Sequence, residues 1–112
     1  FLWRNVTMAI SVNREENPDG SIDLTINIST TQFFNEYWEK AIKDTNVKIF
    51  KENSQFMKSQ MLDVLFELEL IKKWAETNLT GINLEYMTER IENLIESIPK
   101  AFDKDDTILY IY

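Results

Sequence analysis

The chain has 112 residues, of which 19 are acidic and 12 are basic, so its formal net charge is −7. It contains no Cys and no His, which excludes a disulfide framework and a thiolate zinc site and removes the commonest general base and metal ligand. The length suits a single domain with its own core, and two Gly and two Pro are too few for a disordered chain or a many-turned all-β fold.

The first part of the chain is predicted to form a β-hairpin. Residues 2–13 and 21–29 both alternate apolar and polar side chains, as strands with one buried face do. Between them lies the sequence Asn-Pro-Asp-Gly at positions 17–20. Pro18 presets the dihedral of a type I turn, and Gly20 accepts the left-handed conformation that follows. We therefore expect an antiparallel hairpin over residues 2–29.

A first helix is expected at about residues 32–43. Ser29 and Gln32 have the spacing of a capping box at its start. Its aromatic residues repeat at helical spacing, which is more typical of core than of a base-stacking or peptide-docking platform. These are Phe33, Phe34, Tyr37 and Trp38. The following segment, residues 47–51, fits either a short strand or a lead-in to the next helix.

The longest patterned segment is residues 56–75, and it predicts a second helix at about residues 54–76. Asn53 or Ser54 is the expected N-cap. One apolar stripe recurs at intervals of three and four residues: Met57, Met61, Val64, Leu68, Ile71 and Ala75. Further apolar residues, Leu62, Leu65 and Phe66, lie on the far side. A helix that is apolar nearly all round must be covered on several sides, so we expect this one to be the hub of the fold.

A third helix is predicted at about residues 84–98, with Asn83 as its N-cap and Pro99 as its end. Residues 107–112 then read as a strand that is apolar on both faces, which favours a covered or central position. The resulting fold class is α+β: the N-terminal hairpin and the C-terminal strand form a small antiparallel sheet, with three helices packed on one face and the hub nearest the sheet.

The negative charge is concentrated in the second half of the chain. Residues 61–112 carry eleven acids and five bases, whereas residues 1–60 are nearly neutral. This distribution disfavours nucleic acid and anionic membranes as partners and favours a basic protein. Four glutamates form a stripe opposite the apolar face of the third helix: Glu85, Glu89, Glu92 and Glu96. Helical geometry alone favours a solvated face, while the charge excess favours a partner surface.

Two further groups of residues are candidates for contact with a partner. An acidic turn, Asp103, Asp105 and Asp106, could extend the glutamate stripe. On the hub, a seam of Asp63, Glu67, Leu70 and Trp74 could be a binding groove, since Trp is a common interface anchor, or it could be core with an acidic rim. The acids of these groups could in principle act as catalytic pairs or bind a hard metal. Without any His, we expect no catalysis, no metal and no cofactor.

These exclusions lead to the hypothesis of a small acidic binding protein, cytoplasmic and without a small-molecule ligand, that neutralises a basic protein. Bacterial immunity proteins and antitoxins that block nuclease toxins are the class with this profile. A phage-type inhibitor that imitates nucleic acid and an adaptor domain of a larger protein remain alternatives. The residues expected to bind the partner are Glu85, Glu89, Glu92, Glu96, Asp103, Asp105, Asp106, Asp63, Glu67 and Trp74.

Overall fold

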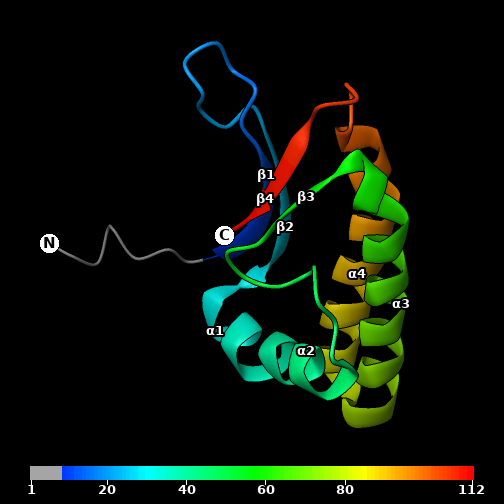
Figure 1. The fold of residues 1–112 in the computed structure, drawn as a ribbon. Coiled ribbons are helices and arrows are strands. Elements are labelled where there is room, and N and C mark those ends of the chain that lie inside the picture. Colours follow the sequence, from blue (N-terminus) through cyan, green and yellow to red (C-terminus); the bar gives the residue numbers. More distant parts are fainter. Residues whose placement is uncertain (1–8) are drawn as a thin grey trace, which may run out of the picture.

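A computed structural model describes residues 9–112, which form one four-stranded sheet with helices against it (Figure 1). The start of the predicted hairpin, residues 2–8, lies outside the described residues. In chain order the elements are β1 (Ala9–Arg14), β2 (Leu24–Thr30), α1 (Thr31–Phe33), the π-helical segment η2 (Phe34–Trp38), α2 (Glu39–Thr45), β3 (Gln55–Met57), the 3-10 turn η3 (Lys58–Gln60), α3 (Met61–Asn78), α4 (Gly81–Ala101) and β4 (Ile108–Ile111).

The predicted hairpin is confirmed for the described residues. Strands β1 and β2 pair antiparallel, and the Gly20 N–H donates to the Asn17 carbonyl at 2.7 Å to close the turn. Gly20 has a φ of +83°, the left-handed conformation expected after a type I turn. The register of the two strands shifts between Ile10 and Ser11, which marks a β-bulge.

The sheet has the strand order β2-β1-β4-β3, and all its pairs are antiparallel. The central position expected for the C-terminal strand is therefore confirmed, because β4 pairs with β1 on one side and β3 on the other. The expectation that Phe56 opens the second helix is wrong. Phe56 is fully buried in β3, opposite Leu109 of β4, and its ring meets Phe102 at 5.8 Å. A three-residue strand is too short to show an alternating pattern, so only its pairing with β4 reveals it.

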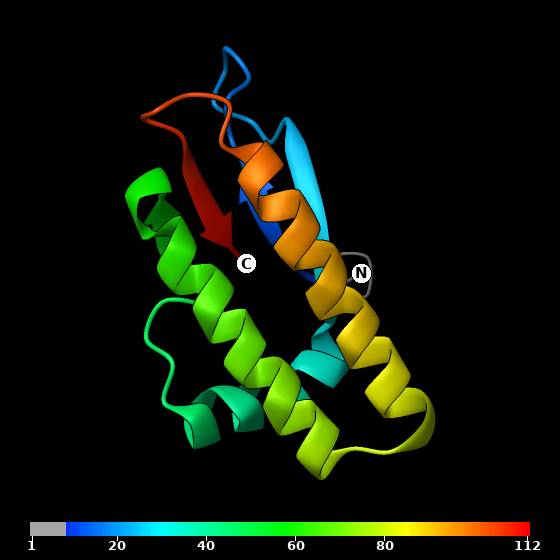
Figure 2. The same ribbon diagram turned by 90° about the vertical axis from the view of Figure 1, so that its right-hand side faces the viewer.

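The two long helices lie side by side over one face of the sheet, as the views in Figures 1 and 2 agree. The first helical segment, α1 to α2, closes one end of this layer. Helix α3 begins at Met61 rather than near residue 54, and Asn53 and Ser54 cap no helix. Helix α4 runs past its predicted bounds at both ends: Thr80, not Asn83, is its N-cap, and Pro99 lies inside its last turn.

The predicted hub stripe is core only in part. Val64, Leu68, Ile71 and Ala75 are fully buried, Met61 is half-buried, and Met57 lies exposed on β3. The hub is also not the helix nearest the sheet, because α4 packs along β2 whereas α3 packs mainly against α4 and α2. The physical reason is the distribution of apolar residues around each helix. Helix α4 has a single apolar stripe, which can be buried against one face of the sheet, whereas the apolar residues of α3 face both α4 and the segment after α2.

The aromatic residues of the first helix pack inward, as the core interpretation predicted. Phe34 and Trp38 are fully buried, and Trp38 meets Phe50 at 5.8 Å. The cap lies one residue later than expected, since the Thr30 hydroxyl accepts the Phe33 N–H at 3.1 Å while Ser29 is part of β2. Within residues 9–112, no helix has the length and hydropathy to cross a membrane.

Candidate functional site on the outer face of the two long helices

The glutamate stripe lies on the outer side of α4. Glu85, Glu89, Glu92 and Glu96 are all exposed, opposite the buried residues that face the sheet and α3. Figure 2 views this layer from outside, with α3 and α4 in front of the sheet. The arrangement of the four glutamates is therefore the one that their spacing predicted.

Only one of these four glutamates has a charged partner within the described residues. The Lys72 ammonium of α3 meets the Glu92 carboxylate at 3.2 Å, and this hydrogen bond raises the pKa of Lys72. The remaining three, Glu85, Glu89 and Glu96, are called the α4 acids below. Like charges one turn apart repel by about 0.2–0.5 kcal/mol per pair, and none of the α4 acids has an ion pair among the described residues to offset this small cost.

Helix α3, which packs against α4, also carries exposed apolar side chains. Leu62 is 74 % exposed and Phe66 is 64 % exposed, one helical turn apart. The sequence pattern predicted that another element covers this side, and none of the described elements does. Leu62 and Phe66 are called the apolar pair below. Exposed large apolar side chains grouped beside polar residues are typical of interaction surfaces.

A shallow groove of about 360 Å³ runs along the other flank of α3, against residues 45–49. Phe66 and Leu70 line it, together with Ile49, so the groove extends the apolar pair around the helix. Asp63 also lines this groove and is exposed. Two members of the predicted hub seam, Asp63 and Leu70, thus lie at a surface.

Glu67 and Trp74, the other two members, are buried and bonded within the protein. Glu67 is 8 % exposed, and its carboxylate accepts backbone N–H groups of Lys48 at 2.9 Å, Ile49 at 3.1 Å and Phe50 at 2.8 Å. The Trp74 indole Nε1 donates to the Asp44 carboxylate at 2.8 Å. Both contacts hold the segment from α2 to Phe50 against α3. The core interpretation of this seam therefore fits Trp74, whereas Glu67 is buried rather than part of an acidic rim.

The acidic turn after α4 is divided between bonded and exposed residues. The Thr107 hydroxyl lies 2.9 Å from the Asp103 carboxylate, and this hydrogen bond holds the pKa of Asp103 below its ordinary value. Asp103 also lies 3.7 Å from the Arg14 guanidinium, and Asp105 lies 3.4 Å from the Lys58 ammonium. Asp106 is exposed and has no ion pair within the described part of the chain.

The structure therefore separates the predicted site residues into three places. The glutamate stripe faces outward on α4, the hub seam lies on the far flank of α3, and the acidic turn follows the end of α4. Sequence reasoning missed the apolar pair as a surface, although its position on the far side of the helix was visible in the pattern.

Residues 9–112 contain no group of three or more acidic side chains placed to hold a metal ion. No protein-family model, no curated protein and no solved structure matches this chain.

Proposed function

We propose that this protein binds a basic protein partner through the outer face of α3 and α4. The observation that carries the proposal is the apolar pair, exposed on α3, together with the α4 acids on the helix packed against it, which have no ion pair among the described residues. A solvated helix needs no exposed Phe and Leu one turn apart. A docking face needs both an apolar anchor and a charged rim.

The two features act at different stages of binding. The α4 acids attract a basic surface over a distance of about 10 Å at moderate salt, and so they raise the association rate. The apolar pair loses its hydration only in the complex, and so it slows dissociation. Affinity should therefore fall with salt through the association rate and with apolar truncation through the dissociation rate.

An immunity protein or antitoxin against a basic nuclease toxin is the functional class that this face fits best. Such a protein needs no catalytic equipment, only a rigid acidic surface that covers the active site of the toxin. A protein that imitates nucleic acid would present carboxylates across several elements, whereas the α4 acids lie on one helix, and the neighbouring helix α3 carries an apolar anchor. Protein docking is therefore the better account of this surface.

The test uses the whole chain immobilised as bait for extracts of the source organism, with the product of the adjacent gene as the first purified candidate. The captured protein is purified, and its affinity is measured by biolayer interferometry against three variants. One variant removes the apolar pair, Leu62→Ser with Phe66→Ser. A second reverses the α4 acids, Glu85→Lys with Glu89→Lys and Glu96→Lys. The matched control makes the same charge change at exposed acids elsewhere, Glu36→Lys with Glu39→Lys and Glu52→Lys.

We expect nanomolar binding of a basic protein, weakened at least about tenfold by each of the first two variants and much less by the control. The purified complex should also lack the activity of the partner, such as nuclease activity. Equal losses in all three variants would indicate a non-specific charge effect. Unchanged affinity in the first two would place the interface elsewhere.

A further inference from the structure

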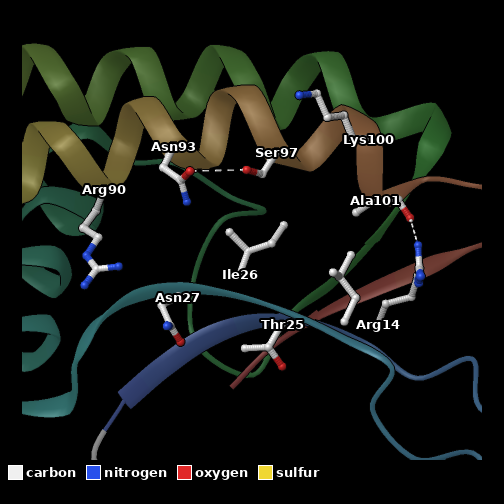
Figure 3. Close-up of a pocket in the computed structure, with 10 residues that line it drawn as sticks. Arg14, Thr25, Ile26, Asn27, Arg90, Asn93, Ser97, Lys100 and Ala101 are labelled. Atoms are coloured by element: carbon white, nitrogen blue, oxygen red, sulfur yellow. Dashed lines mark hydrogen bonds between the residues drawn. The ribbon is translucent and has the colours of Figure 1, made fainter.

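One flank of α4 borders a pocket of about 540 Å³ between this helix and strand β2, an edge strand of the sheet (Figure 3). No carboxylate lines it, although the chain has 19 acidic residues. Both arginines of the described part, Arg14 and Arg90, line it together with Lys100. A pocket that collects cations and excludes acids on a protein of net charge −7 is a candidate anion site.

Arg90, which lines this pocket, has an unpaired hydrogen-bond donor. Its guanidinium carbon lies over the Tyr86 ring, 5.3 Å from the ring centroid, which is a cation–π contact. Its Nε atom is buried and has no hydrogen-bond partner within residues 9–112. In Figure 3 the side chain leaves α4 and points into the space between this helix and β2. A buried N–H without a partner costs about 1–3 kcal/mol and calls for an explanation, and a bound ion or ligand is one that the pocket beside Arg90 offers.

The other two cations have different roles. Arg14 is already neutralised, because its guanidinium meets Asp23 at 2.7 Å and Glu16 at 3.3 Å and donates to the Ala101 carbonyl at 2.9 Å. Arg14 therefore forms a fixed end wall of the pocket. Lys100 is exposed and has no ion pair in the described part of the chain. Arg90 and Lys100 are ten residues apart on α4, about 15 Å along the helix axis.

The wall between these cations combines polar groups with an apolar surface. Asn93 and Ser97 follow Arg90 along the same side of α4, and Ile26 points toward them from β2. The Thr25 and Asn27 side chains point away from α4 and are bonded to Asn13 and Ser11 of β1. Leu24 and Ile26 supply the apolar part of the lining. A small number of polar groups on a partly apolar wall, in a volume of this size, is the usual composition of a small-molecule site.

We propose that this pocket binds a small molecule bearing a carboxylate or phosphate group, with the Arg90 guanidinium as the main ligand of the oxyanion. Arginine suits this role because its planar N–H groups match two oxygens of such a group. Lys100 serves a second anionic group or the far end of the same molecule. This site lies on the flank of α4 that faces β2, whereas the proposed protein interface lies on the outer side of the helix, and it revises the expectation that a small-molecule ligand is absent.

The test titrates inorganic phosphate and, in a separate arm, succinate into the ¹⁵N-labelled full chain at constant ionic strength, followed by NMR. The Nε–H signal of Arg90 and the amide signals of Asn93 and Ser97 report on the pocket. Three substitutions are compared: Arg90→Gln, Lys100→Gln and, as a matched control, Lys73→Gln on the exposed face of α3. A fourth variant, Ser97→Glu, places a carboxylate in the pocket and leaves Arg90 in position.

We expect saturable shifts at the pocket signals with at least one of the two probes, and the stronger probe identifies the class of oxyanion. Arg90→Gln and Ser97→Glu should each weaken binding at least about tenfold, Lys100→Gln about threefold, and Lys73→Gln should leave it unchanged. If Arg90→Gln fails to fold, Ser97→Glu decides the question. Linear, unsaturated shifts with both probes, or equal effects in all the variants, would overturn the proposal.

Discussion

Glu67 and the α4 acids are all glutamates on long helices, but they differ in burial and in hydrogen bonding. Glu67 is buried and accepts backbone N–H groups from three consecutive residues, 48–50. The α4 acids, Glu85, Glu89 and Glu96, are exposed and have no ion pair in the described structure. The sequence shows each of them only as an acid on a helix near apolar residues.

The difference arises from what lies opposite each carboxylate. The segment after α2 runs without regular structure from Asn46, whose φ is +59°, so its N–H groups have no helix or strand partner. A carboxylate on the facing helix satisfies three of them together, in the manner of an anion at a helix N-terminus. Nothing of this kind faces the outer side of α4, so its acids remain available to a partner.

The largest effect is expected from removing the bonded acid. Glu67→Ala leaves three backbone N–H groups without an acceptor at a site largely shielded from solvent. It should therefore lower the free energy of unfolding by about 3 kcal/mol. Glu67→Gln retains one carbonyl acceptor and should cost less than Glu67→Ala. Urea unfolding followed by far-UV circular dichroism measures both.

The control for this prediction is Glu69→Ala, an exposed acid two residues along the same helix, which should change stability by less than about 0.5 kcal/mol. If Glu67→Ala were as harmless as the control, residues 48–50 would not depend on the carboxylate. Glu67 would then not differ from the α4 acids in its contribution to stability.

A second bonded acid, Asp44, should show a smaller dependence. Its carboxylate accepts the Trp74 Nε1–H at 2.8 Å, and it is itself exposed. Trp74→Phe should cost about 1–2 kcal/mol through the lost hydrogen bond and lost ring volume. A double-mutant cycle with Asp44→Ala isolates the pair, and its coupling energy should be about 1 kcal/mol. A coupling near zero would show that Trp74 stabilises α3 by packing alone.

The fold was predictable from the sequence where the signal is local and repeated. The hairpin turn at residues 17–20, the buried stripe of α3 from Val64 to Ala75 and the central C-terminal strand all follow from patterns that a few neighbouring residues set. Strand β3 was not predictable because three residues show no period. The start of the second helix was misplaced for the same reason, since Phe56 and Met57 happen to continue the helical spacing of the stripe.

The site was less predictable because it depends on contacts between distant segments. Position on the helix identified the outward acids of α4. The bonded role of Glu67 depends on residues 17–19 positions earlier, and the pocket at Arg90 depends on β2. The exposure of the apolar pair was also invisible, because a pattern shows which side of a helix is apolar and not whether another element covers it.

The stability of the protein at low pH tests the role of a third hydrogen-bonded carboxylate, that of Asp23. The hydrogen bond from the Arg14 guanidinium holds the pKa of Asp23 below its ordinary value. A lowered folded-state pKa contributes stability above the unfolded value of about 3.9, and this contribution is lost as pH falls through the folded pKa. Unfolding midpoints in urea at pH 6 and at successively lower pH should therefore converge for the wild type and Asp23→Asn. Parallel curves at every pH would contradict this role of the ion pair.

The smallest effect on stability is expected from the α4 acids themselves. Replacing Glu85, Glu89 and Glu96 together by Gln removes like-charge repulsion one turn apart and breaks no hydrogen bond or ion pair within the described residues. Stability should stay within about 0.5 kcal/mol of the wild type, with a small increase that disappears in 0.5 M NaCl as screening removes the repulsion. A clear loss of stability would mean that these carboxylates hold the fold, as Glu67 does. The unchanged fold expected here is what makes the same positions usable for binding, because a loss of partner affinity in this variant could not come from unfolding.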